Sequence, residues 1–541
     1  MSTNYTDAKN YGKQFFSGVA ILAISTFVVK IIGLFYKIPM MIYLGAEGMG
    51  YFNSAYEIYS LFFVISTTGI PVAISILISE NKTQKRFDNI KKIFNISMLT
   101  LGIIGLICTL FMGVFYKQFA TLISNKAAGL SILAISPTVL LVCLSSAIRG
   151  YFQGNQTMVP TAVSQVIEAL GKLLLGLGFA IIAINKGYDM PIVAAFAILG
   201  VTIGVAISLL YLIGYKLLYR MKEVNNGGYT ETDANLTIVK QIFSIALPIT
   251  LSSTILSLTK IIDMSMILGR LNSIGYSQMV ANEIYGSYST MAVSIYNLPS
   301  TLVTAIALPL VPMLASAIED SDQVKEKSVI AVALKMTALV SFPTGLGIAV
   351  FSKPILKLLF SSQSDEIEYT APLLSLLGIS IFLSAMITIT NAILQAYKQV
   401  NKPIISMLCG ILVKITLAYI LIGIPSINIY GAPISTFFST AVIVAINLYY
   451  IVTNSGRVGS LSKMFIKPFV SSFLAVTMGV GLYLIIGSVW GAKTTILVVI
   501  SIVALVYILS IIKFNVIDVE EILMLPKGES IVKFLRKIHL V

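Results

Sequence analysis

The sequence predicts an all-α membrane protein with about fourteen transmembrane helices. Composition is the first reason: of 541 residues, 57% are apolar and only 11% are charged, whereas soluble domains carry about 25% charged residues. The second reason is the length of the apolar stretches. The stretch from Ile93 to Phe115 has none of the alternation of a membrane β-strand, and about 20 such residues span a bilayer as a helix. The chain therefore leaves no room for a large aqueous domain.

About fourteen stretches are long enough to cross the membrane, and they cover residues 16–41, 51–80, 93–116, 128–152, 158–185, 190–218, 238–268, 282–317, 327–352, 369–397, 402–424, 430–453, 465–488 and 492–513. An even number of crossings places both termini on the same side of the membrane. Lysine and arginine concentrate in the loops of that side, for example in residues 82–92, and the positive-inside rule assigns it to the cytoplasm. The net charge of +14 therefore reflects topology, and we expect no nucleic-acid surface.

The two halves of the chain repeat an order of features. One set is Lys37, Leu44-Gly45 and Glu57-Ile58-Tyr59, matched by Lys260, Leu268-Gly269 and Glu283-Ile284-Tyr285. Another is Gln153, Pro160 and Lys172, matched by Gln395, Pro403 and Lys414. An even number of spans separates the partners, so both halves point the same way through the membrane. The alternative is chance similarity between apolar segments.

The repeat predicts two six-helix lobes, residues 1–220 and 241–455, in parallel orientation. A cytoplasmic linker, residues 221–240, would join them. Residues 456–513 would form two additional transmembrane helices. The remaining tail, residues 514–541, mixes apolar and basic residues, which fits an amphipathic segment on the inner leaflet or a disordered one.

Residue types exclude most chemistry. The single histidine, His539, stands two residues from the end, and Cys108, Cys143 and Cys409 lie apart in apolar stretches. The membrane-spanning part of the sequence therefore does not offer the residues for a catalytic triad, a metal site or a redox pair. We expect a transporter rather than an enzyme, with no cofactor and no metal.

Charged residues inside apolar spans are candidate functional residues, because an ion at mid-bilayer costs a few kcal/mol or more. The cations are Lys30, Lys37, Lys172, Lys260, Lys335 and Lys414, and the anions are Glu57, Glu168, Asp263 and Glu283. Lys30 and Lys37 are two turns apart and share one helix face, which would suit a diphosphate. Alternatively, Lys37 extends its ammonium group to the membrane interface. We assign substrate binding to Lys30, Lys37, Glu57, Lys260, Asp263 and Glu283.

Other charges have competing interpretations. Glu168 and Lys172 are spaced i,i+4 and Lys260 and Asp263 are spaced i,i+3, so each pair could neutralise itself within one helix. Arg149 could be a simple positive-inside anchor or part of a gate. We assign a gate or motif role to Arg149, Gln153, Glu168 and Lys172.

The most specific motif is Arg149-Gly150-Tyr151-Phe152-Gln153-Gly154, with residues 158–162 and 164–168 after it and residues 45–51 and 69–74 before it. It resembles the polysaccharide-exporter branch of the multidrug/oligosaccharidyl-lipid/polysaccharide superfamily, and within it the MurJ/YtgP/SpoVB group. The resemblance covers nearly the whole chain. It implies a flippase that moves undecaprenyl-diphosphate-linked peptidoglycan precursor, lipid II, by alternating access, with a lipid-tail groove at the last two helices. Members of the family often have arginines in the cavity, where this chain has Lys30 and Lys37. Lysine binds phosphate as a point charge and lacks the bidentate hydrogen bonding of arginine.

Three alternatives stay open at this point. The substrate could be another lipid-linked glycan, such as a teichoic acid, capsule or spore-wall precursor. A cation-coupled multidrug antiporter of the same superfamily would want an acidic cavity, which the lysines disfavour. A scaffold for cell-wall synthesis proteins would leave the buried charges without a role. We expect a cell-membrane location and contacts with membrane lipids, and transport could be coupled to the membrane potential, sodium or protons.

Overall fold

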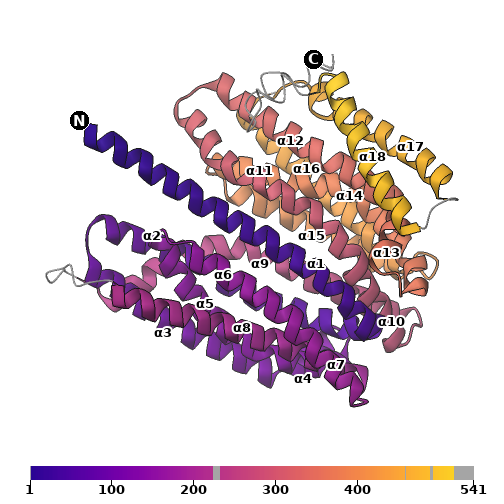
Figure 1. Cartoon of the computed structure of the whole chain (residues 1–541), viewed down its shortest axis with the longest axis horizontal. Coiled ribbons are helices and arrows are strands. Elements are labelled where there is room, and N and C mark those ends of the chain that lie inside the picture. Colours follow the sequence, from indigo (N-terminus) through magenta and orange to yellow (C-terminus); the bar gives the residue numbers. More distant parts are fainter. Residues whose placement is uncertain (1, 223–231, 457, 488–491, 517–541) are drawn as a thin grey trace. The chain divides into compact units, whose positions relative to one another are not determined.

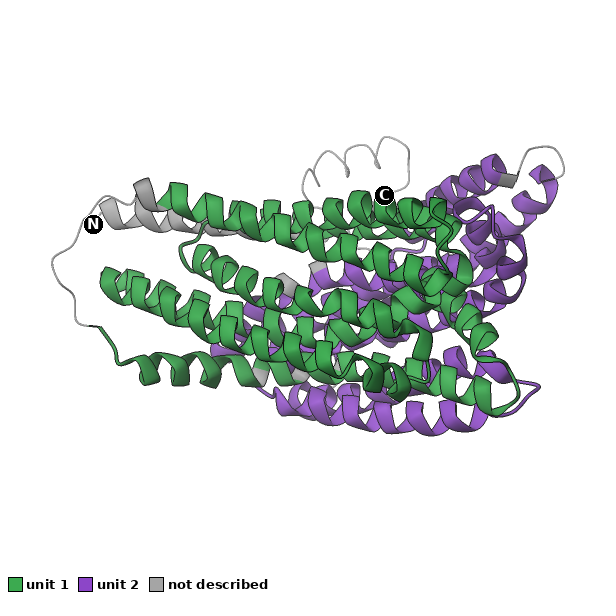
Figure 2. Ribbon diagram, turned by 90° about the horizontal axis from the view of Figure 1, so that it is seen from below, with its two compact units in different colours: residues 1–290 green, residues 291–541 purple. Residues whose placement is uncertain are grey.

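The computed structural model describes residues 2–222, 232–456, 458–487 and 492–516, and this part of the chain consists of helices without strands. Helices are expected because lipid offers no hydrogen-bond partner, so a spanning segment must satisfy its own backbone groups. The prediction of an all-α membrane fold is therefore confirmed. The segment 223–231 of the predicted linker and most of the predicted tail, 517–541, lie outside the described residues. Contacts divide the chain into two compact units, residues 1–290 and 291–541 (Figure 2).

The first unit is a helical bundle, in which α1, α5 and α8 pack on one another and α3 and α6 pack beside them (Figure 1). Its helices are α1 (Ser2–Thr67), α2 (Ile70–Thr83), α3 (Phe87–Val114), α4 (Tyr116–Leu122), α5 (Gly129–Gly154), α6 (Val159–Gly171), α7 (Leu177–Asn185), α8 (Met190–Lys222), α9 (Asn235–Ser273) and α10 (Gln278–Ser287). Short 3-10 and π segments are η1 (Lys126–Ala128), η2 (Lys172–Gly176) and η3 (Tyr288–Ala292).

The second unit contains two packed groups of helices. In the first group α14 packs against α11, α12 and α16, and α15 packs on α16; in the second, α17 packs on α12 and α18. The elements are α11 (Val293–Glu319), α12 (Gln323–Val350), α13 (Ser352–Leu359), α14 (Ser364–Ala396), α15 (Asn401–Ile422), η4 (Asn428–Tyr430), α16 (Gly431–Ser455), η5 (Ser462–Ile466), α17 (Lys467–Ile486) and α18 (Ala492–Lys513). Lys335 and Lys467 donate hydrogen bonds to carbonyl oxygens just after α18, at 3.2 and 2.8 Å, and thereby cap that helix.

Eleven helices of the described chain are long and apolar enough to cross a membrane, or up to twelve if the bent pair in α9 counts as one. One of the eleven, Ile24–Thr83, has 60 residues, whereas one crossing needs about 20. It contains Gly45 at φ 62°, a left-handed conformation that glycine adopts without steric cost. The segment is therefore long enough for two crossings. The total of about fourteen spans and the cytoplasmic placement of both termini stay predictions.

The segment between the first two expected spans is more regular than the sequence suggested. Residues 42–50 lie between the expected spans 16–41 and 51–80, yet they are helical on both sides of Gly45. Three of these residues are glycines at positions 45, 48 and 50, and the last allows a close approach. A Cβ on Gly50 would lie 2.4 Å from the side chain of Asn282. Close packing against another helix thus stabilises a segment whose glycine content favours a loop.

This close contact joins α1 to α10 through small residues and amides. A Cβ on Gly286 would lie 2.0 Å from the carbonyl oxygen of Ala46. Asn282 donates a hydrogen bond of 2.7 Å to the carbonyl oxygen of Glu47, and the Asn125 amide donates one of 2.7 Å to Asn282 Oδ1. Buried amides with such partners specify one register between neighbouring helices.

Candidate functional site

Charged side chains from three distant parts of the first unit meet within its bundle. Lys37 belongs to α1 before its kink, Glu57 to α1 after it, Lys172 to the start of η2 and Lys260 to α9. Lys37 interacts electrostatically with Lys172, Glu57 and Lys260. Lys172 in turn interacts with Glu57 and Glu168. We call Lys37, Glu57, Lys172 and Lys260 the cationic cluster.

Lys30 extends the cluster along α1. It is exposed in the described structure and interacts electrostatically with Lys260. Lys37, seven residues later, interacts with the same Lys260. A spacing of two helical turns predicts a shared face, and a common partner on α9 agrees with it.

Three aromatic rings hold the Lys172 ammonium group. Its Nζ lies 4.0 Å from the ring centroid of Tyr56, 5.0 Å from that of Tyr36 and 5.8 Å from that of Phe52. A cation over a ring face is stabilised by about 0.5–2 kcal/mol, with the larger values where water is excluded. The lysine thus keeps a fixed position although it lies in an apolar bundle.

Two local features support this aromatic site. Lys172 begins the π-helical segment η2, and such single-turn irregularities in helices are frequent at functional sites. Tyr36 is 1% exposed, and its hydroxyl has no hydrogen-bond partner among the residues that the structure describes. Because an unsatisfied buried hydroxyl is costly, this group is suited to bind an oxygen of a ligand.

Arg149 lies inside the bundle, and its predicted role in a gate stays a prediction. It is 7% exposed, too buried for a simple interfacial anchor. Its Nη2 lies 3.0 Å from Glu168 Oε2 and 3.4 Å from Ser208 Oγ, and its Nε donates to Ser164 Oγ at 3.0 Å. Arg149 therefore links α5, α6 and α8.

The Arg149 contact also bears on the i,i+4 pair of Glu168 and Lys172. These two residues interact electrostatically, as their spacing allows, but the ion pair of Glu168 is with Arg149, at 3.0 Å. The Lys172 ammonium group lies against the aromatic rings. The bundle thus brings Glu168 a charged hydrogen-bond donor from another helix, which the spacing along the chain does not reveal.

The other predicted residues lie around the cluster. Asp263 and Glu57 both interact electrostatically with the buried Tyr285, so α9 brings Asp263 close to the cluster. Glu283 interacts with Tyr51 near the α1–α10 contact. Gln153 lies in the last turn of α5, four residues after Arg149, and is partly buried. Their predicted roles in substrate binding and gating stay predictions.

Sequence reasoning missed Tyr36 and Phe52. Both are aromatic residues on α1, close in sequence to the predicted Lys37 and Glu57, which was the only available signal. Their association with Lys172 depends on contacts between residues more than a hundred positions apart. In the part of the chain that the structure describes, no group of three or more histidine, cysteine or acidic side chains could hold a metal ion.

Comparison with known proteins places this site in a family. The profile described as "Polysaccharide biosynthesis protein" matches residues 15–319, which is more than half of the chain. The chain belongs to this family. A second profile, MatE, matches residues 248–420.

Relatives and solved structures agree with this assignment. The chain is 27% identical to stage V sporulation protein B of Bacillus subtilis (strain 168) over 78% of this chain and 80% of the relative. It is 25% identical to lipid II flippase MurJ of the same organism, covering 86% of this chain and 88% of MurJ. A solved structure of lipid II flippase MurJ in an inward closed conformation matches with a TM-score of 0.68 and 18% identity, covering 91% and 98% of the two chains.

An inward-facing multidrug transporter of the MATE family matches with a TM-score of 0.63 and 15% identity, over 81% of this chain and 98% of that one. The resemblance to the MurJ and SpoVB group is thus confirmed. The chain is a multi-pass membrane protein and a transporter of the superfamily that contains both flippases and multidrug transporters.

Proposed function

We propose that this transporter moves a lipid-linked diphosphate glycan, lipid II, across the membrane by alternating access. The observation that carries the proposal is the cationic cluster. Lys37, Lys172 and Lys260 interact with one another or with the same carboxylate, Glu57, and Lys30 adds a fourth cation. Cations brought together in a medium of low dielectric repel one another. A bound diphosphate, with two or more negative charges, would relieve that repulsion.

The arrangement also suits the chemistry of a diphosphate. Lysine binds phosphate as a point charge with three donors, so several lysines can surround two phosphate groups without a planar fork. The Tyr36 hydroxyl adds a neutral donor beside Lys172. The relationship to MurJ supports lipid II, and the relationship to stage V sporulation protein B keeps a spore-wall precursor as the second candidate.

A multidrug antiporter is the alternative from another class, and the MatE match to residues 248–420 favours it. Such a transporter binds organic cations, which the excess of lysines in the cluster would repel. The two proposals therefore predict opposite charge preferences for the ligand.

The first experiment is complementation of a bacterium depleted of its essential lipid II flippase. We expect growth with the native chain and with Lys30→Arg, and no growth with Lys30→Ala or Lys37→Ala. Lys240→Ala is the matched control, because Lys240 is an exposed lysine of α9 outside the cluster. Each variant is first shown to be present in the membrane. Growth of the alanine variants would remove the lysines from the site.

A direct assay separates the candidate substrates. Proteoliposomes containing the purified chain are loaded with fluorescent lipid II, with another undecaprenyl-diphosphate glycan, or with an organic cation dye. Selective movement of lipid II supports the proposal. Movement of the other glycan alone would reassign the substrate, and movement of the dye would favour the antiporter.

The coupling energy is part of the same proposal. A net cationic site that changes sides in the membrane field gains about 2.3 kcal/mol per charge for each 100 mV. With a potential negative inside, this would favour return of the unloaded site towards the cytoplasm. We expect transport in vesicles to slow when the potential is collapsed, and an unchanged rate would refute this coupling.

A further inference from the structure

A separate pocket lies on the flank of the first unit, at the end of the bundle where α3 begins and α5 and α8 end. It has a volume of about 390 Å³ and is lined by Lys91, Phe94, Asn95, Met98, Ile148, Tyr151, Ile213, Lys216 and Leu217. None of these residues belongs to the cationic cluster. We propose that this pocket binds an anionic membrane phospholipid, with its phosphate at the two lysines and an acyl chain against the apolar wall.

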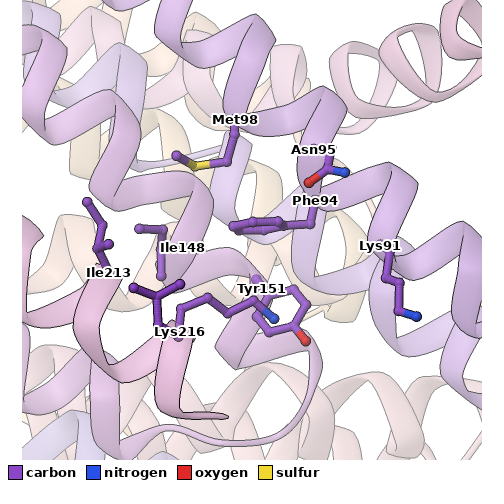
Figure 3. Close-up of a pocket in the computed structure, with 9 residues that line it drawn as sticks. Lys91, Phe94, Asn95, Met98, Ile148, Tyr151, Ile213 and Lys216 are labelled. Carbon is purple, nitrogen blue, oxygen red and sulfur yellow. The ribbon is translucent and has the colours of Figure 1, made fainter. Parts of the chain in front are cut away.

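The pocket has a charged part and an apolar part. Figure 3 shows Met98, Ile148 and Ile213 on one side of the Phe94 ring and Lys91 on the other. A free phosphate would need only the charged part. A phospholipid has both an anionic group and an acyl chain, and it fits both parts of the wall.

Aromatic contacts fix the position of Lys216. Its Nζ lies 3.3 Å from the ring centroid of Tyr151 and 5.3 Å from that of Phe94 (Figure 3). Both rings line the pocket, so the ammonium group is held at its wall rather than extended away from the protein. Lys91, in the first two turns of α3, is 66% exposed, and its Nζ lies 4.0 Å from Asp88 Oδ1 in a loose ion pair that a phosphate would replace. One cation held by aromatic rings and one exposed cation thus line the same pocket.

The surroundings identify a lipid rather than a soluble anion. Leu217, on the pocket wall, is 59% exposed, and Leu210, two turns earlier on α8, is 67% exposed. Leu99 and Ile103 continue the exposed apolar surface along α3, at 66% and 51%. In a multi-pass membrane protein such a surface faces acyl chains. The pocket thus opens on lipid at the end of the bundle that the lysine distribution assigns to the cytoplasmic leaflet, where anionic lipids and basic pockets between helices meet.

The test uses the full-length chain in neutral detergent and measures thermal stabilisation as phosphatidylglycerol or phosphatidylcholine of equal chain length is titrated. We expect phosphatidylglycerol to bind more tightly. Lys91→Met and Lys216→Met should each weaken its binding about fivefold, and the double variant about 25-fold, leaving phosphatidylcholine unaffected. Lys92→Met is the matched control, because Lys92 is the next residue on α3 and does not line the pocket. Ile213→Trp should weaken both lipids by filling the apolar part.

Four results would overturn the proposal. The first is equal affinity for the two lipids in the native chain. The second is an unchanged preference in Lys91→Met, whose exposed side chain makes a folding defect implausible. The third is displacement of phosphatidylglycerol by millimolar inorganic phosphate, which would indicate an anion site without a lipid. Displacement by undecaprenyl phosphate at equal concentration would likewise overturn it, because the pocket would then belong to the transported substrate.

Discussion

The buried ion pair between Arg149 and Glu168 makes a quantitative prediction about stability. Removing one partner of a buried pair costs about 3–5 kcal/mol, because the other charge is left unpaired. Interhelical hydrogen bonds in membrane proteins contribute only about 0.6 kcal/mol each, so the charge and not the number of bonds decides the magnitude. The Arg149 side chain is 8% exposed and that of Glu168 is 24% exposed, so water partly solvates the remaining carboxylate. We therefore expect Arg149→Gln to destabilise the unit by about 3 kcal/mol.

A double-mutant cycle isolates the pair. Glu168→Gln alone should cost a similar amount, because it leaves the buried guanidinium with only serine partners, Ser164 and Ser208. The double variant has no unpaired charge. Its loss should be about 2 kcal/mol smaller than the sum of the two single losses, within the range for residues in contact. The free energies of unfolding of the native chain and the three variants are measured on the full-length chain in mixed micelles, by steric trapping or by circular dichroism.

The Arg86–Asp233 pair is the matched control. Its oxygen–nitrogen distance is 2.8 Å, as short as that of the buried pair, but its side chains are 28% and 26% exposed. The two carboxylates are about equally exposed, but the Arg86 guanidinium is more exposed than that of Arg149. Solvated pairs contribute about 0–1 kcal/mol, so the coupling of the control pair should be smaller. A coupling between Arg149 and Glu168 below about 0.5 kcal/mol, or no larger than that of the control, would refute the reasoning from burial.

Three further predictions follow from local geometry. Gly286→Ala should destabilise the first unit by about 1–3 kcal/mol, since its Cβ would lie 2.0 Å from a carbonyl oxygen of α1, whereas Gly33→Ala has open space and should be neutral in the same melting assay. Hydrogen bonds from Arg86 and Asn89 lower the pKa of Asp233. The carboxylate therefore contributes to the stability of the fold near neutral pH, and this contribution is lost as the pH falls below about 4. The difference in stability between the native chain and Asp233→Asn should shrink at that pH. Tyr56→Leu should reduce lipid II transport by loosening Lys172, whereas Tyr56→Phe retains the ring and the activity.

Each of these predictions has a clear contradicting result. Equal melting temperatures for Gly286→Ala and the native chain would show that α10 can move away without loss. A stability difference for Asp233→Asn that persists unchanged at pH 3 would remove ionisation as its cause. Full transport by Tyr56→Leu would show that the ring only packs the bundle.

Much of the fold follows from the sequence because membrane helices are specified locally. In lipid, an apolar stretch such as 93–115 must form its backbone hydrogen bonds within itself, so the stretch alone predicts α3. The same logic identified Lys30, Lys37 and Lys260 as candidates, because a cation within such a stretch is costly without a partner. The motif around Arg149 indicated the family, which the profile of residues 15–319 then confirmed.

Partner choice was decided only by the tertiary structure. From the sequence, Glu168 had Lys172 as its nearest cation on one helix, yet the bundle gives it Arg149 from α5. The Lys172 ammonium group lies against the rings of Tyr36, Phe52 and Tyr56, which α1 supplies from more than a hundred residues away. The helical continuation around Gly45 likewise depends on packing against α10. The sequence determined the apolar spans and which charges lie within them, because those depend on local hydrophobicity. The pairing of these charges required the packed bundle, because it depends on which helices become neighbours.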